Sequence, residues 1–174
     1  MALTKMNLMN LNQQSEKDAK LLFMQCCTSV QWVNKMTHAR PFADMSSLKK
    51  TANDSWKDLQ ETDFLQAFDG HPKIGDVNTL REKYSNTKIL ASGEQGLVSE
   101  ATDQVISSLS SGNKEYFDKF GFIFIVCATG KSAVEMLSLL QQRLPNGRDI
   151  ELINASEEQR KIFQIRLDKL LDIN

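Results

Sequence analysis

Few residues interrupt helical periodicity in this chain. Its 174 residues include only 3 prolines and 8 glycines, the residue types that most often end a helix. Between them, apolar residues recur at spacings of three and four, as they do on the buried face of an amphipathic helix. We therefore predict an all-α fold, a bundle of about eight helices. The longest apolar stripe consists of Leu97, Val98, Ala101, Val105, Ile106 and Leu109.

Three shorter stripes precede the longest one and predict helices that begin near residues 15, 30 and 46. Each presents at least four apolar side chains at helical spacing, and both tryptophans are expected in the core. The members are Ala19, Leu22, Phe23 and Cys26, then Val30, Trp32, Val33 and Met36, then Leu48, Ala52, Trp56 and Leu59.

Three other segments give weaker signals. Residues 76–92 carry little periodicity. The apolar block from Tyr116 to Ala128 has a composition that permits a buried strand, but no partner strand is evident, so we predict a buried helical segment. Ser156 followed three residues later by Gln159 is a capping-box pattern. It predicts that the last helix begins there and runs to about Leu171.

The length of the chain and its lack of an internal repeat or linker indicate one domain, residues 1–174, with residues 1–14 as a loosely ordered lead. A net charge of −1 with no cluster of Lys or Arg gives no attraction to nucleic acid. The longest strongly apolar run, from Phe120 to Ala128, is far short of the roughly 20 residues that a membrane span needs. We expect neither nucleic acid nor a membrane as a partner.

The cysteines and the chain ends bear on compartment and on metal binding. Cys26, Cys27 and Cys127 form an odd set with an adjacent pair, which is a poor framework for disulfides. The N-terminus has no signal-peptide core, and Asp172-Ile173-Asn174 is not a peroxisomal tripeptide. These observations predict a cytoplasmic protein. The 2 histidines and 3 cysteines offer no metal-ligand spacing, so no metal is expected.

One histidine stands in a segment too broken to be helical. His71 follows Gly70 and precedes Pro72, which disfavours helical geometry at the residue before it. Imidazole titrates close to working pH, and a titratable group on a stiff turn suits general acid or base catalysis. The alternative is a turn that simply exposes a histidine.

Two charged residues share faces with apolar residues. Glu94 lies three and seven positions before Leu97 and Ala101, and Arg166 lies three positions after Phe163. Charged side chains are rarely buried without a partner. Glu94 could stabilise the start of its helix as an anion, or both residues could form structural ion pairs. In the third interpretation both line a pocket, where Arg166 would bind an anionic substrate.

These residues belong to a longer series of motifs between about residues 26 and 171. In this order, the series resembles the 2-oxo-4-hydroxy-4-carboxy-5-ureidoimidazoline (OHCU) decarboxylases of urate breakdown. The motifs are Arg40-Pro41-Phe42, Phe64-Leu65-Gln66-Ala67-Phe68, His71-Pro72-Lys73-Ile74-Gly75, Ser92-Gly93-Glu94-Gln95, the block from Phe120 to Lys131, Arg143-Leu144, Glu158-Gln159-Arg160-Lys161-Ile162 and Arg166-Leu167.

The resemblance implies an all-helical, cofactor-free carboxy-lyase, usually a homodimer, that converts OHCU to (S)-allantoin. It implies His71, Glu94 and Arg166 as catalytic residues. Family members often have a serine three residues before the glutamate; here Ala91 stands there and Ser92 is one position closer. The implied substrate-binding residues are Pro72, Ser92, Gln95, Phe122, Ile123, Phe124, Ile125 and Val126.

The implied chemistry needs no metal or pyridoxal, because groups beside the departing carboxylate can delocalise the electrons that it leaves. We expect His71 to transfer the proton, Glu94 to bind ureido or ring nitrogens, and Arg166 to neutralise an oxyanion or carboxylate. Backbone groups of residues 122–126 would hold the planar ring. Two alternatives stay open: a non-catalytic helical interaction module, and a related lyase for another ureido or imidazoline acid.

Overall fold

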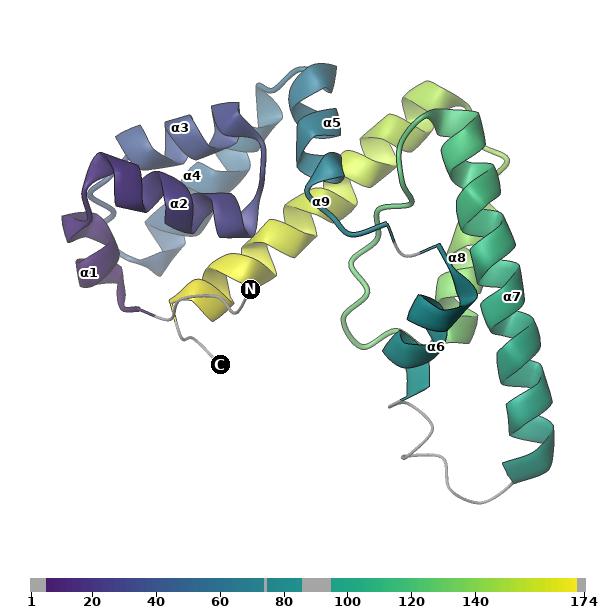
Figure 1. The fold of residues 1–174 in the computed structure, drawn as a ribbon. Coiled ribbons are helices and arrows are strands. Elements are labelled where there is room, and N and C mark those ends of the chain that lie inside the picture. Colours follow the sequence, from purple (N-terminus) through teal and green to yellow (C-terminus); the bar gives the residue numbers. More distant parts are fainter. Residues whose placement is uncertain (1–5, 74, 86–94, 172–174) are drawn as a thin grey trace. The chain divides into compact units, whose positions relative to one another are not determined.

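The computed structural model describes residues 6–73, 75–85 and 95–171, with side chains in all of these except 85 and 95–102. The prediction of an all-α fold is confirmed, since the described ranges contain nine helices and no strand (Figure 1). The helices are α1 (Leu8–Gln13), α2 (Glu16–Cys26), α3 (Val30–His38), α4 (Met45–Lys57), α5 (Glu61–Asp69), α6 (Val77–Ser85), α7 (Gln95–Phe120), α8 (Ala133–Arg143) and α9 (Arg148–Leu170).

Polar side chains at the N-terminal ends explain where several helices begin. The Ser15 hydroxyl caps α2 by accepting a hydrogen bond from the backbone of the first turn. Asp44 and Ser47 form a capping box at the start of α4, and Ser132 and Glu135 form another at the start of α8. The sequence therefore specifies these starts locally, before any tertiary packing.

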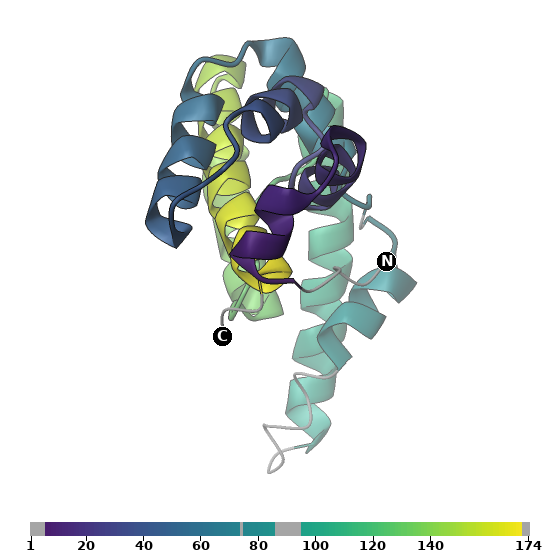
Figure 2. The same cartoon turned by 90° about the vertical axis from the view of Figure 1, so that its left-hand side faces the viewer.

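The chain divides into two compact units, and the first lies within Met1–His71, Ile125–Cys127 and Ala155–Asn174. Its core surrounds Trp32, which is fully buried with Phe23 and Phe163. The Trp32 and Phe163 ring centroids are 4.9 Å apart, and the indole N–H donates to the Ala52 carbonyl at 3.0 Å. Figures 1 and 2 show α2, α3 and α4 gathered around the C-terminal part of α9. Both tryptophans are in the core, as predicted.

Helix α1 corrects the expectation of a loosely ordered lead for residues 6–14, the part of residues 1–14 that the structure describes. The Asn7 side chain accepts from the Asn10 N–H at 2.8 Å and caps the helix. Leu11 is fully buried in the core of the first unit, and the Met6 N–H donates to the Leu170 carbonyl at 2.9 Å. A single well-buried leucine is too short a pattern for periodicity to reveal.

The second unit consists of Pro72–Phe124 and Ala128–Asn154 and contains α6, α7, α8 and the beginning of α9. Helices α7 and α8 pack side by side (Figures 1 and 2). Gly112 allows this close approach, because a Cβ at residue 112 would lie 2.7 Å from Leu140 Cδ2. The buried side chains of the unit include Ile106, Leu109 and Tyr116.

Two predicted elements are wrong in their boundaries. The block from Tyr116 to Ala128 is helical only as far as Phe120, where α7 ends; Gly121 adopts a positive φ of 78° and an irregular segment follows. The last helix begins at Arg148, directly after the Pro145-Asn146-Gly147 break, so Ser156 lies inside α9 rather than at its cap. Helix α6 occupies part of the stretch that has little periodicity.

Candidate functional site

The turn that carries His71 is fixed by a close contact between the Gly70 backbone and the Thr28 side chain. After α5, the His71 N–H donates to the Phe68 carbonyl at 3.0 Å. A Cβ at residue 70 would lie 2.1 Å from Thr28 Oγ1, so this position excludes a side chain. The Thr28 hydroxyl donates to the Gln66 carbonyl at 3.0 Å. His71 therefore follows a turn that is packed tightly against the residues before α3.

The His71 imidazole is half-buried between two residues of α9. Its Nε2 is 2.5 Å from Gln159 Oε1, and its Nδ1 is 3.5 Å from a terminal nitrogen of Arg166. Burial and the Arg166 charge lower the pKa of His71 below its ordinary 6.5, while the Gln159 hydrogen bond acts in the opposite direction. At neutral pH the imidazole is therefore uncharged.

Arg166 is anchored at one end but has no anionic partner among the described side chains. It donates to the Cys26 carbonyl at 3.1 Å. The thiols of Cys26 and Cys27 lie near this charge, yet burial raises the pKa of each to about 12, so both are neutral at physiological pH. A half-buried guanidinium beside a neutral imidazole and two neutral thiols is suited to bind an anion.

Gln159 was predicted only as a helix cap, and the structure gives it a different environment. The residue is fully buried inside α9. Its Oε1 meets His71, whereas its Nε2 has no hydrogen-bond partner in the described part of the chain. The neighbouring Cys27 thiol, whose pKa Gln159 acts to lower, is only a weak hydrogen-bonding group for that donor. The available signal was spacing: Gln159, Phe163, Arg166 and Leu170 recur at intervals of four, three and four.

The segment after α7 was predicted to bind substrate through its backbone. Phe122 and Ile125 are buried, and the other three residues from 122 to 126 are half-buried. Residues 122–124 belong to the second unit, and residues 125 and 126 belong to the first. Glu158 holds the part in the first unit, because its carboxylate accepts from the Cys127 N–H at 2.7 Å. This role of Glu158 was not predicted.

The other predicted site residues are less informative. Glu94 and Ser92 lie outside the described residues. Gln95 is the first residue of α7, and its side chain is not described. Pro72 is exposed in the second unit. Of the predicted catalytic residues, the structure therefore brings together His71 and Arg166.

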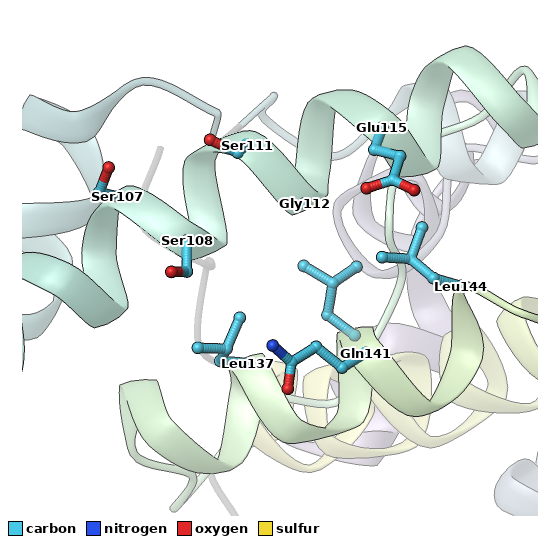
Figure 3. A pocket seen from close by; sticks show the side chains of 9 residues that line it. Ser107, Ser108, Ser111, Gly112, Glu115, Leu137, Gln141 and Leu144 are labelled. Atoms are coloured by element: carbon cyan, nitrogen blue, oxygen red, sulfur yellow. The ribbon is translucent and has the colours of Figure 1, made fainter.

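A pocket of about 310 Å³ lies elsewhere, between α7 and α8 (Figure 3). Small polar residues of α7 face Leu137 and Gln141 of α8 across it. Its lining includes none of the predicted site residues. The full lining is Ser107, Ser108, Ser111, Gly112, Glu115, Leu137, Leu140, Gln141 and Leu144.

Metal-ligand clusters and membrane-spanning helices are both absent from the described residues. No three His, Cys, Asp or Glu side chains are grouped there as metal ligands would be. Within the same ranges, no helix combines the length and the apolar character required to cross a bilayer.

Several proteins are similar in sequence to this chain over most of its length. The uric acid degradation bifunctional protein TTL of Arabidopsis thaliana is 33% identical over 146 residues, which cover 83% of this chain and 45% of that protein. The 2-oxo-4-hydroxy-4-carboxy-5-ureidoimidazoline decarboxylase of Halalkalicoccus jeotgali is 25% identical, with 80% of this chain and 77% of that protein covered. The chain spans less than half the length of the bifunctional relatives.

Solved structures of OHCU decarboxylase and (S)-allantoin synthase have a similar fold. A crystal structure of an OHCU decarboxylase in the presence of (S)-allantoin superposes with a TM-score of 0.69 and 30% identity, covering 91% of this chain and 99% of the other. An (S)-allantoin synthase structure, 16% identical, shares the fold with a TM-score of 0.67 over 95% of this chain and 54% of that one. The sequence model of the OHCU decarboxylases matches residues 12–168, a range that includes His71, Gln159 and Arg166. By this match, and with a helical fold to support it, the chain belongs to the OHCU decarboxylase family.

Proposed function

We propose that this chain decarboxylates OHCU to (S)-allantoin and carbon dioxide without a cofactor. The observation that carries the proposal is the pair formed by His71 and Arg166: a neutral imidazole lies 3.5 Å from a guanidinium that has no carboxylate partner among the described residues. A substrate carboxylate or oxyanion would supply that partner. Family membership and the named relatives support the same substrate.

The proton balance of the reaction defines what the residues must do. The name of the substrate places its hydroxyl and carboxyl groups on C4 and its ureido group on C5. When the bond to the carboxylate breaks, its electron pair passes into the ring, and a ring nitrogen takes a proton from solution. C4 then becomes a carbonyl as the hydroxyl loses its proton, and C5 gains the hydrogen that sets the S configuration. The carboxylate form of the substrate thus consumes one proton overall.

We assign the transfer of the hydroxyl proton to His71. A neutral imidazole has one nitrogen that can accept a proton and pass it on. Its position on a packed turn would restrict delivery to one face of the ring, which accounts for a single enantiomer. Arg166 would hold the departing carboxylate or the oxyanion on C4 next to that nitrogen.

The roles of the remaining residues are predicted from the sequence alone. Glu94 would hydrogen-bond the ureido or ring nitrogens, and Ser92, Gln95 and Pro72 would contact the substrate. Backbone groups of residues 122–126 would hold the ring. We also propose one functional domain, because the family match from residue 12 to residue 168 includes parts of both compact units.

Assembly and compartment complete the proposal. We propose a homodimer, and sedimentation at micromolar protein concentration measures this directly. We propose a reducing compartment such as the cytoplasm, since all three cysteines are buried thiols.

The chain offers a matched pair of histidine variants for the test. OHCU would be generated from urate with urate oxidase and hydroxyisourate hydrolase, and (S)-allantoin followed by circular dichroism. We expect His71→Ala to lose roughly 10²- to 10⁴-fold in rate, the usual contribution of a general acid or base. His38→Ala is the control, because His38 is exposed and lies 3.8 Å from Glu16. Wild-type protein that yields only slow, racemic product would refute the proposed reaction. Equal rates in His71→Ala and His38→Ala would show that His71 does not transfer the proton.

A further inference from the structure

We propose that Gln159 is a positioning residue, whose side-chain carbonyl holds His71 in the neutral tautomer with its proton on Nε2 and its lone pair on Nδ1. The inference rests on the proposed function only where it assigns a catalytic consequence to this tautomer. The tautomer itself follows from two contacts around the imidazole, with a third observation on the Gln159 amide, and can be measured without any turnover.

The first contact comes from Arg166. A guanidinium has donors only and cannot accept a hydrogen bond. Its terminal nitrogen is 3.5 Å from His71 Nδ1. A proton on Nδ1 would therefore point one N–H group at another beside a full positive charge. This contact favours the lone pair of His71 on Nδ1, on the side where Arg166 would bring a substrate anion, but a contact of 3.5 Å does not fix the tautomer without an acceptor at Nε2.

The second contact comes from Gln159. With Nδ1 unprotonated, the proton of the neutral ring is on Nε2, which needs an acceptor. Gln159 Oε1 lies 2.5 Å from it. A flipped amide would place an NH₂ group against this N–H, so the amide orientation and the tautomer determine each other. Full burial of Gln159 prevents water from substituting for it easily.

The third observation is the donor that Gln159 leaves unmet. Buried side-chain donors almost always have a partner, and an unmet one destabilises the protein. Apart from the weakly interacting Cys27 thiol, Gln159 Nε2 has no partner in the described part of the chain. A residue of the same shape without polar atoms would avoid that cost, yet it would also remove the acceptor for His71. The acceptor is therefore the feature that explains a glutamine at this position.

The tautomer can be read directly from ¹⁵N shifts of the full-length protein labelled at histidine. With 2 histidines in the chain, His38→Ala assigns both rings. Above pH 7 we expect wild-type His71 to show a protonated Nε2 and an unprotonated Nδ1. In Gln159→Leu we expect a mixture of both tautomers. We also expect kcat for OHCU to fall roughly 10- to 100-fold, as with other residues that orient a catalytic group, while KM changes by less than about threefold.

Two further variants separate positioning from packing. Gln159→Glu keeps an acceptor at the same place, so we expect it to restore the Nε2-protonated tautomer and to recover part of kcat. Gln164→Leu is the matched control on α9. Its amide donates to the Lys49 carbonyl at 3.0 Å and to Asn53 Oδ1 at 2.8 Å, and its loss should leave the His71 spectrum unchanged.

The outcomes are distinct. Gln159→Leu with a wild-type His71 spectrum and wild-type kcat would overturn the inference, as would an equal loss of kcat in Gln164→Leu. Wild-type protein that shows the expected tautomer but does not decarboxylate OHCU would refute the proposed function and leave the positioning role standing. If Gln159→Leu does not fold, Gln159→Met removes the acceptor with a more flexible side chain, and the same spectrum decides.

Discussion

Each of the two compact units contains a buried polar cluster, and the two clusters are satisfied to different degrees. In the second unit, Glu151 is fully buried and its carboxylate accepts from four side chains. Tyr116 donates at 2.6 Å, Asn146 at 2.9 Å and Asn154 at 3.2 Å, and Arg143 completes the set with a charged contact. In the first unit, the side-chain carbonyl of the buried residue Gln159 contacts His71, whereas its NH₂ group has no strong partner among the described residues.

The difference indicates what each cluster is for. The Glu151 cluster balances a negative charge with a positive one and supplies hydrogen bonds to both oxygens, which is the arrangement of a structural ion pair. The first unit instead keeps a buried amide donor whose neighbour among the described residues is a weakly interacting thiol, and a guanidinium with no carboxylate partner among the same side chains. Leaving a buried donor fully unmet typically costs about 1–3 kcal/mol. Poorly satisfied groups of this kind are typical of sites that bind a ligand. The comparison therefore predicts that substitutions in the Glu151 cluster lower stability and that substitutions around Gln159 and Arg166 lower activity.

The largest expected effect on stability comes from Glu151→Leu. It leaves the Arg143 charge, whose side chain is only 12% exposed, without its partner. We expect the free energy of unfolding to fall by about 3–5 kcal/mol, measured by chemical denaturation at fixed protein concentration. Glu157→Leu on the same helix is the control: its ion pair with Arg160 is half-exposed and is worth roughly 0–1 kcal/mol. Equal losses from both variants would mean that the Glu151 cluster is not structural.

A smaller effect is expected from Tyr116→Phe, which removes one of the four donors and keeps the buried ring. Burial raises the pKa of Tyr116, so its hydroxyl stays protonated and donates to Glu151. A hydrogen bond to a charged group contributes roughly 1.5–3 kcal/mol. We expect a stability loss of that size by denaturation, with the OHCU decarboxylation rate per folded molecule unchanged.

We expect the opposite from Gln159→Leu: the free energy of unfolding stays near that of wild type, whereas kcat for OHCU falls. A Tyr116→Phe protein that unfolds like wild type but turns over slowly would reverse the roles of the two clusters.

The smallest effect concerns the pH dependence of stability. The pKa of His71 is lowered on folding, first by burial and then by Arg166. Below pH 6.5 the unfolded chain therefore binds more protons than the folded one, and stability falls as pH drops through the folded-state pKa. We expect His71→Gln to reduce the slope of unfolding free energy against pH between 5 and 7 by a fraction of one proton. An identical slope in both proteins would show that His71 is not shielded from solvent.

Periodicity predicts the first unit well because its helices bury apolar stripes. Ala19, Leu22, Phe23 and Cys26 are all buried in α2, as the sequence indicates. It fails for the start of α9 because the buried face there is not apolar: Glu151 is buried, while Ile150 and Ile153 are exposed. A helix held by a buried carboxylate cannot be recognised from hydrophobic spacing.

The residues of the candidate site were likewise predicted only in part. His71 and Arg166 stand out in the sequence because one is on a broken turn and the other on an apolar face. Their separation of 3.5 Å is a tertiary fact that no local pattern contains. Gln159 was mistaken for a cap because its polarity fits a helix start, and Glu158 was missed because its acceptor role depends on a segment 31 residues away.

The continuity of α9 has a consequence for how the family can vary in length. Gln159 and Arg166 are seven residues apart on one helix, a separation that returns to the same face within about 20°. One residue inserted or deleted between them would rotate one side chain about 100° around the axis relative to the other. His71 could then no longer meet both. Insertions and deletions among relatives should therefore be absent between residues 159 and 166, even where neighbouring loops change freely.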